Sequence, residues 1–546
     1  MAEIAGVGGD AGALGQAEIE PVDQDAAARC GGGHAVSPGR PDPAHRGPAV
    51  DGAVPCRPIA CRMAGEVSRE TGGATRRGGC GASPAVRAAR PPRLSRTGRT
   101  MPSAIAYDVT RLFLGPLSRT PRGIDRVDHA FARHFFDHPS RDCVGVLPTF
   151  WGMRVFSGDR VRAGLDRLEA LLAENRRLDQ DKVWASLCTA LAGGPAVDWA
   201  AAWNPGLWRQ TRRMGSLLAA TGFSFGRPVR RAVPPGAVYL NIGHTALTVP
   251  LLLRWLDARP DVRPVFMLHD VIPLTATDLV EAESTRHHAT MVASTARWAA
   301  GLLTTTTTAR DEIRAALAEA GRPDLATVAA ALPLASVFGG PIAAEPRLAG
   351  IDYFVICGAI EPRKNHDLLR EVWKRLVVRH GAATPHLVVV GSPGWLGKSI
   401  VDRLTRAQAT TGLIHVVSGL SSAALKRLLA GARGLLMPSH AEGFGLPILE
   451  ASEIGIPVIA SDIPAHREIG GANVVLIDPI DGPGWVAAIE ARLAADRAAP
   501  RGTLPAAVDA DQAAYFRTIE AFLDGLTPND RPPPQPRGRG ARTMLS

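Results

Sequence analysis

Cysteine pairs, long apolar runs and a concentrated charge of one sign are all missing from this sequence. The seven cysteines include no CxxC pair, and four of them lie in the first hundred residues. This spacing excludes a cysteine-based zinc site and a disulfide framework, and it favours isolated reduced thiols. No run approaches the roughly 18 uncharged apolar residues that a membrane-spanning helix needs. We therefore expect a cytoplasmic protein.

The positive charge is spread thinly. The formal net charge is +10, of which residues 1–100 and residues 529–546 contribute +3 each. The middle of the chain has no basic stripe of the kind that nucleic-acid binding usually needs. Nucleic acid is thus not an expected partner, whereas a weak attraction to anionic substrates or to a membrane surface stays open.

Residues 1–100 differ in composition from the rest. They are rich in Gly, Ala, Pro and Arg, without a sustained period of 2 or 3.6 residues. Such a segment buries too little apolar surface to offset its ordering entropy. We expect a disordered or spurious extension, with translation starting at or near Met101. The intact mass of the native protein would refute this if it included residues 1–100.

From Met101 onward, strand and helix patterns alternate in two series. Strands are predicted at AIAYDV, VGVLPTF, AVYLNIG and PVFMLHDVI, and helices at RVDHAFARHFF and VPLLLRWLDA. The second series starts with YFVICG, continues through a helix at 366–380 and ends at VVLID. Alternation of this kind predicts parallel sheets with crossover helices. Segment 160–235 is less regular, and its elements stay unassigned.

We therefore expect an α/β protein with two Rossmann-like domains. The first spans 101–335, residues 336–350 form a linker, and the second spans 351–525. Residues 526–546 are predicted to be a disordered tail because they are rich in Pro, Gly and Arg. Two such domains in tandem bind a ligand in the cleft between the carboxyl ends of their strands.

The most informative motif is HAEGFGLPILE, which follows the predicted buried strand GLLMPS. Gly443 and Gly445 let the backbone pass close to a ligand, and Pro447 suits the first turn of a helix. Glu442 and Glu450 can then face the same cleft mouth, where one accepts sugar hydroxyls and the other a ribose diol. Taken singly, each glutamate is better explained as a solvated or helix-start charge. The glycine context between them favours function.

A second motif, GAIEPRKN, follows the strand YFVIC. A glycine at a strand end, followed by Arg363 and Lys364 before a helix, predicts a diphosphate site built from cations and helix amides. The alternative is a turn with solvated charges. Pairing with the glutamate motif favours the diphosphate site.

Together these motifs resemble the donor domain of the retaining glycosyltransferases of family 4, which have the GT-B fold. The family's E-x7-E signature is matched by Glu442 and Glu450. The resemblance implies that Glu442 and the main chain of Gly443, Phe444, Gly445 and Leu446 hold the donor sugar. It also implies that Glu450 binds the ribose, and Arg363 with Lys364 the diphosphate. Many members have Arg after the strand-end glycine, where this chain has Ala359, so the phosphate role falls to Arg363 and Lys364.

The first domain carries weaker signals. LHDVIP follows a strand and resembles the family's cleft histidine motif, which assigns His269 a catalytic position beside the transferred sugar. His244 in NIGHT is interpreted as structural. The loop around Arg122 and Gly123 resembles the glycine loop that faces the donor phosphates or the acceptor, but an ordinary helix start explains it nearly as well. The run Thr304–Thr308 is interpreted as a β-branched strand.

The resemblance implies a retaining transfer of a hexose, with mannose from a GDP donor favoured, to a glycan or lipid-linked acceptor. It implies no cofactor and no metal, and it is compatible with a peripheral position at the inner face of the plasma membrane. Two alternatives stay open. One is a glycoside hydrolase that uses Glu442 and Glu450 as its acid and base, and the other is a non-catalytic sugar-nucleotide-binding protein.

Overall fold

The computed structural model describes most of the chain beyond residue 102. The described residues are 103–115, 123–138, 141–174, 178, 181–195, 197, 206–222, 224–332, 338, 343–471, 473–495 and 512–532. They all belong to one compact unit, Arg96–Ser546. The predictions for residues 1–100 and for Arg122 lie outside the described residues.

The first half is built on an eight-stranded sheet in the order β4-β3-β2-β1-β5-β6-β7-β8. Strands β1, β2 and β5 to β8 are parallel, whereas β3 and β4 add an antiparallel edge. The strands are β1 (Ile105–Asp108), β2 (Cys143–Thr149), β3 (Gly152–Ser157), β4 (Arg227–Pro228), β5 (Val238–Asn241), β6 (Arg263–Met267), β7 (Gly301–Thr304) and β8 (Thr327–Ala329). The four strands predicted in this half are confirmed.

Helices cover both faces of this sheet. Along β1, Ile105 and Tyr107 join one apolar cluster and Ala106 another, because side chains alternate between the faces of a strand. The helical elements are α1 (Thr110–Leu114), α2 (Gly123–Asp137), α3 (Gly158–Glu174), α4 (Lys182–Leu191), α5 (Gly206–Thr221), α6 (Val229–Ala232), α7 (Thr245–Thr248), η3 (Pro250–Ala258), α8 (Ile272–Thr275), η4 (Thr277–Leu279), α9 (Ala282–Trp298) and α10 (Thr307–Glu319). The helix predicted at VPLLLRWLDA is a 3-10 helix, η3.

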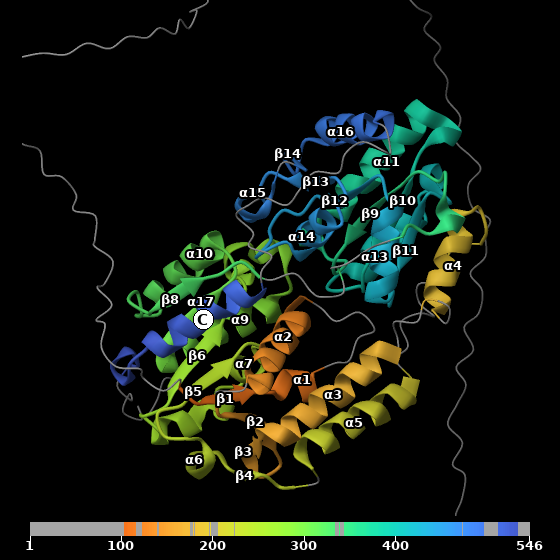
Figure 1. Cartoon of the computed structure of the whole chain (residues 1–546). Coiled ribbons are helices and arrows are strands. Elements are labelled where there is room, and N and C mark those ends of the chain that lie inside the picture. The colour runs from red at the N-terminus through yellow and green to blue at the C-terminus, as the bar shows by residue number, and fades with distance from the viewer. Residues whose placement is uncertain are drawn as a thin grey trace, which may run out of the picture. The chain divides into compact units, whose positions relative to one another are not determined.

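The second half is built on a six-stranded parallel sheet in the order β11-β10-β9-β12-β13-β14 (Figure 1). Its strands are β9 (Tyr353–Cys357), β10 (His386–Val390), β11 (Ile414–Val417), β12 (Gly434–Met437), β13 (Val458–Ser461) and β14 (Val474–Ile477). The expected α/β fold class with two Rossmann-like sheets is confirmed.

Helices also cover both faces of the second sheet. Phe354 and Ile356 pack in a cluster with α11 and α16, whereas Val355 faces the cluster that contains α13 and α14. The helical elements are η6 (Pro346–Leu348), η7 (Pro362–Lys364), α11 (His366–His380), η8 (Gly381–Ala383), α12 (Gly397–Thr405), η9 (Gln408–Thr410), α13 (Ser422–Gly431), α14 (Leu446–Glu453), α15 (Pro464–Ile469), α16 (Gly482–Ala494), α17 (Gln512–Gly525) and η10 (Pro528–Asp530). The helix predicted at 366–380 is α11.

Two helices pack on the half to which they do not belong in sequence. Helix α4, from the unassigned segment 160–235, contacts β11, and Asp181 at its start accepts a hydrogen bond from the Ser421 amide at 3.4 Å (Figure 1). Helix α17 contacts the first half, where Phe516 stacks on His134 at 3.8 Å between ring centroids. Arg141 donates to Asp524 at 2.6 Å. These contacts attach α17 to the first sheet, whereas the sequence assigned residues up to 525 to the donor domain.

Two local predictions are wrong. The run Thr304–Thr308 is not a strand throughout, because β7 ends at Thr304 and the Thr306 side chain caps α10 by accepting from the Ala309 amide at 3.0 Å. The tail does not begin at residue 526, because Leu526 is buried and Arg531 donates to the Leu256 carbonyl at 2.8 Å. The first prediction fails because a hydrogen bond from the Ala309 amide to the Thr306 side chain starts a helix. The second fails because Arg531 is held by a hydrogen bond to a residue far away in the sequence.

Candidate active site

The two motifs in the second half lie at the carboxyl ends of neighbouring strands. The basic motif follows β9 and the glutamate motif follows β12, and these strands pair side by side. From β9 the chain continues to β10 on one side, and from β12 it continues to β13 on the other side. The order of the strands therefore reverses between β9 and β12, which makes this pair the topological switch point of the sheet. The His440 amide donates to the Arg363 carbonyl at 2.8 Å, which joins the two loops directly.

The basic motif has an irregular backbone that its sequence explains. Gly358 has φ 151°, and a Cβ there would lie 3.2 Å from Cε of Lys364, whose side chain crosses the glycine. Asn365 adopts a left-handed conformation, φ 56°, and its amide group donates to the carbonyls of Pro438 and Pro479. Helix α11 therefore begins without a side-chain cap, which leaves its first turn suited to an anion.

Glu442 is the centre of a buried ion-pair cluster. Its carboxylate accepts from Lys364 Nζ, from Arg363 at 3.1 Å and from the Ser439 hydroxyl at 2.6 Å. Arg363 also pairs with Glu361 at 2.6 Å. The side chains of Glu442 and Lys364 are 7% and 9% exposed. Two cations and two carboxylates thus balance, so a negatively charged ligand would have to compete with Glu442 for Lys364 and Arg363.

The charges in this cluster shift one another's titration. Burial alone would raise the pKa of Glu442, but the adjacent Lys364 and Arg363 outweigh it and hold that pKa well below its usual range. Burial, together with the charge of Arg363, lowers the pKa of Lys364 although Glu442 opposes this. The pKa of Arg363 is raised because Glu442 and Glu361 outweigh its burial. Glu442 is therefore ionised at neutral pH.

The glycines of the glutamate motif approach protein rather than open space. A Cβ on Gly443 would lie 2.8 Å from Cβ of Asp270 and 2.8 Å from the carbonyl oxygen of His269. Gly445 has φ 102°, and a Cβ there would lie 2.8 Å from Ile469. The Gly443 carbonyl accepts from the Thr306 hydroxyl at 3.1 Å. The first half and the glutamate motif are thereby in direct contact, and Phe444 is buried in the core.

Glu450 is bound by a residue from the first half. It lies in α14 with a side chain 2% exposed, and it accepts from Arg126 of α2. Burial raises the pKa of Glu450, and Arg126 opposes that shift. Gly123, three residues before Arg126, lies against Leu446, since a Cβ on Gly123 would be 2.9 Å from its Cδ1. The starts of α2 and α14 therefore meet.

The sequence analysis did not single out Arg126, Ser439 or the hydroxyls of Thr305 and Thr306. Arg126 lies only three residues after Gly123 of the predicted glycine loop, but its partner Glu450 lies 324 residues away. No local pattern pairs them. The threonines were assigned to a strand, which hid their hydrogen bonds to the Gly443 carbonyl.

His269 and His244 form a buried neutral pair in the first half. Their ring centroids are 4.9 Å apart, and the Nε2 atom of each ring lacks a hydrogen-bond partner among the described residues. Burial lowers the pKa of His269 to about 4 and that of His244 well below its usual value. His244 has φ 66° at the start of α7, and its amide donates to the Asn241 side chain at 3.1 Å. Two neutral rings are thus left with unused nitrogen atoms.

The predicted site residues that the structure describes lie in one region. Gly443 contacts His269, Leu446 contacts Gly123, and both Glu450 and Lys364 act electrostatically on the thiol of Cys357 at the end of β9. Burial raises the pKa of that thiol. Glu442 and Glu450, which the sequence assigned to sugar and ribose, are engaged by different cations from different halves. The arrangement offers carboxylates, cations and helix amides to a polar, negatively charged ligand.

Residues 352–495, which carry this cluster, match the family model described as glycosyl transferases group 1. This part of the chain is similar to group 1 glycosyl transferases, and we call residues 352–495 the glycosyl transferase domain. The domain contains both motifs on which the family resemblance was based, so the recognition from sequence is confirmed.

Mannosyltransferases are among the proteins to which this chain is similar. The serotype-specific mannosyltransferase WbdA of Escherichia coli is 27% identical over 221 residues, which cover 37% of this chain and 26% of the relative. The O-antigen chain mannosyltransferase B of Escherichia coli is 33% identical over 141 residues, covering 26% of this chain and 36% of the relative. The match thus spans about a quarter to a third of these relatives.

Among solved structures, HepE from Anabaena in complex with UDP-glucose aligns over 72% of this chain and 90% of its own, with 14% identity and a TM-score of 0.45. Within the described part of this chain, no helix is long and apolar enough to cross a membrane.

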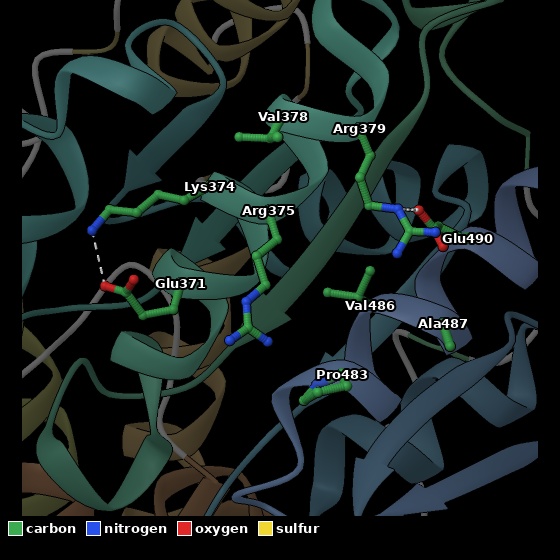
Figure 2. Close-up of a pocket in the computed structure, with 9 residues that line it drawn as sticks. All are labelled: Glu371, Lys374, Arg375, Val378, Arg379, Pro483, Val486, Ala487 and Glu490. Atoms are coloured by element: carbon green, nitrogen blue, oxygen red, sulfur yellow. Dashed lines mark hydrogen bonds and ion pairs between the residues drawn. The ribbon is translucent and has the colours of Figure 1, made fainter. Parts of the chain in front are cut away.

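A pocket of about 470 Å³ opens elsewhere on the glycosyl transferase domain, between α11 and α16 (Figure 2). Its lining includes Lys374, which pairs with Glu371 at 3.0 Å, and Arg379, which pairs with Glu490 at 2.9 Å. None of the site residues predicted from sequence lines it. The Lys374–Glu371 pair lies within α11 and the Arg379–Glu490 pair joins α11 to α16, and neither includes a residue of the cluster around Glu442.

Proposed function

We propose that this protein is a retaining glycosyltransferase that moves a hexose, mannose by preference, from a nucleoside diphosphate sugar to a hydroxyl of a glycan or lipid-linked acceptor. The observation that carries the proposal is the cluster of Lys364, Arg363 and Glu442 at the switch point of the glycosyl transferase domain. The two relatives named as mannosyltransferases support the choice of mannose.

In the proposed reaction, the bond between C1 of the sugar and the diphosphate oxygen breaks while a bond from C1 to the acceptor oxygen forms. The diphosphate gathers negative charge, which Lys364, Arg363 and the first amides of α11 stabilise more strongly than the ground state. The acceptor proton passes to the departing phosphate, as the family resemblance implies. The same resemblance gives no role to a metal or cofactor.

Each remaining residue has a distinct task in the proposal. Glu442, released from Lys364 by the diphosphate, accepts hydroxyls of the donor sugar. Glu450 releases Arg126 and accepts hydrogen bonds from the ribose diol. The Nε2 atom of neutral His269, which has no partner among the described residues, forms a hydrogen bond with the transferred sugar. Contact between Gly443 and His269 brings the donor loop and this histidine together.

The hydrolase alternative finds less support in the geometry. A hydrolase has no use for two cations beside Glu442, whereas a diphosphate leaving group needs them. We further propose that the protein works in the cytoplasm, at the periphery of the inner membrane face, in polysaccharide biosynthesis.

A thermal-shift screen with GDP, UDP and ADP and their sugars tests the proposal first. Stabilisation by one diphosphate and not by its nucleoside is expected, with GDP favoured. Transfer from the matching sugar nucleotide is then measured with Glu442→Ala. Full transfer by a folded Glu442→Ala variant would favour the binding protein, and donor hydrolysis as fast as transfer would favour the hydrolase.

A further inference from the structure

The hairpin between β2 and β3 carries two aromatic residues at its turn. Phe150 is 95% exposed and Trp151 is 57% exposed. Two-residue hairpin turns favour Asn, Asp and Gly, because these residues adopt the required backbone conformations most easily. Large apolar side chains at this position are therefore not explained by turn formation, and they expose apolar surface to water.

The backbone of this turn is held in one conformation. The Thr149 hydroxyl donates to the Gly152 carbonyl at 2.9 Å and accepts from the Trp151 amide at 3.2 Å. Gly152 has φ 91°. Phe225, which is 66% exposed, packs edge-on against Trp151 with ring centroids 4.6 Å apart. We call Phe150, Trp151 and Phe225 the aromatic tip.

Positive charge accompanies the aromatic tip. From residue 199 to residue 256 the chain contains no Asp or Glu and no Lys, but seven Arg. Three of these lie on β4 and α6, directly after Phe225, and their side chains are exposed: Arg227, Arg230 and Arg231. Strand β4 pairs with β3, so the cations and the aromatic tip belong to one antiparallel ribbon.

The turn also lies at the carboxyl ends of the strands of the first sheet, where His269 lies. Strands β2 and β6 are both parallel to β1, so their carboxyl ends share one edge. The order β2-β1-β5-β6 separates them by three strand spacings, about 14 Å at roughly 4.8 Å each. An acceptor held at the aromatic tip would need to extend only a few sugar units to reach His269.

We infer that the aromatic tip and the arginines of β4 and α6 dock the protein onto the surface of an anionic lipid bilayer. Aromatic side chains settle at the boundary between headgroups and acyl chains, and arginines add attraction to anionic lipids. The inference rests on the proposed function in one respect: docking there would present a lipid-linked acceptor to the proposed transfer site.

A bilayer fits these observations better than a glycan chain. Glycans are held by hydrogen bonds to carboxylates and amides as well as by ring stacking, and the acid-free stretch supplies no carboxylate. A bilayer needs the combination of exposed rings and exposed cations that this ribbon provides.

Co-sedimentation of the full chain with vesicles tests the inference. Vesicles of phosphatidylcholine with a third of phosphatidylglycerol should bind the protein, and pure phosphatidylcholine should bind it at least about tenfold more weakly. Phe150→Ala/Trp151→Ala should lower binding to the anionic vesicles about tenfold or more, with residual binding that is salt-sensitive. Arg230→Glu/Arg231→Glu should lower binding about tenfold and remove most of its salt dependence.

Val378→Ala is the matched control, because Val378 is 87% exposed on α11 of the other half and should leave vesicle binding unchanged. Thermal stabilisation by the preferred nucleoside diphosphate is measured for every variant. A double variant that loses vesicle binding but is still stabilised by the nucleoside diphosphate supports the inference. If the nucleoside diphosphate does not stabilise the wild type, this result counts against the proposed function alone. Two results would overturn the docking surface: no vesicle binding by the wild type, or vesicle binding that both double variants leave unchanged.

Discussion

The two halves of the molecule line their strand ends with opposite kinds of polar groups. In the second half, Glu442, Lys364 and Arg363 are charged and paired with one another. In the first half, His269 and His244 are buried and neutral, and their Nε2 atoms lack partners among the described residues. Both sets occupy the carboxyl edge of a parallel sheet.

This difference shows how one type of sheet edge can serve two chemistries. Paired charges survive burial because each compensates the other, and a diphosphate can replace one member of the pair. Neutral rings tolerate burial without a counter-charge and keep hydrogen-bonding capacity for sugar hydroxyls. Under the proposed function, the second half would bind the anionic part of the donor and the first half its uncharged part.

Lys364→Ala should give the largest effect, because it leaves the Glu442 carboxylate buried without its nearest cation. We expect the free energy of unfolding to fall by about 3–5 kcal/mol in denaturant titrations. Calorimetric affinity should fall far more for the diphosphate than for the nucleoside. Lys398→Ala, at an exposed lysine, is the control. Equal losses for diphosphate and nucleoside would contradict the charged character of this half.

Arg126→Ala tests a cation of the first half that pairs with a carboxylate of the glycosyl transferase domain. Glu450 loses its ion-pair partner but can take up a proton, since burial already raises its pKa. The expected loss in unfolding free energy is therefore smaller, about 2 kcal/mol, measured by chemical denaturation at neutral pH. Arg126→Lys should recover part of it. A loss as large as that of Lys364→Ala would mean that the two glutamates are not electrostatically distinct.

His269→Gln tests the neutral character of the first half through pH. The unfolded histidine binds a proton near its ordinary pKa of 6.5, whereas in the folded protein that pKa is about 4. Stability is therefore lost as pH falls between these values, because the unfolded state takes up the proton first. From about pH 7.5 to about pH 5 this residue should account for about 2 kcal/mol of the loss in unfolding free energy.

The glutamine variant should therefore show a shallower decline with pH than the wild type when both are titrated with urea at each pH. An identical decline in the two proteins would mean that folding does not lower the pKa of His269.

Glu468→Ala should have the smallest effect. Glu468 of α15 accepts from the amides of Thr307 at 2.6 Å and Thr308 at 3.1 Å, so it caps α10 across the two halves. Its loss should cost about 1 kcal/mol, seen as a small drop in Tm. Glu468→Gln should retain part of this stabilisation. No change at all would mean that water replaces the carboxylate without cost.

The sequence predicted the sheets well because buried parallel strands are short apolar runs with turn residues at both ends. Helix α11 and strand β9 follow this rule, and the basic motif between them was located for the same reason. The glutamate motif was found because glycine and proline mark the start of α14. Each of these features depends on neighbours within a few residues.

The remaining features depend on distant partners. Arg126 acquires its role from Glu450, and Thr306, whose β-branched side chain suggested a strand, donates to the Gly443 carbonyl 137 residues away. Gly443 was assigned to a ligand, but its immediate neighbours are His269 and Asp270. The local sequence pattern identifies the residue type that an irregular backbone needs. It does not identify which residues from distant parts of the chain contact that backbone.

The crossed packing of α4 and α17 has a consequence for dissecting the gene. If the chain were divided in the linker (residues 336–350), α17 would be separated from the first half, on which it packs, and α4 would be separated from β11. Each piece would then carry a helix that belongs on its counterpart, together with a bare apolar surface of the matching shape. Neither piece is expected to stay in solution alone, but the two co-expressed should find each other and rebuild the native molecule, as split reporters do.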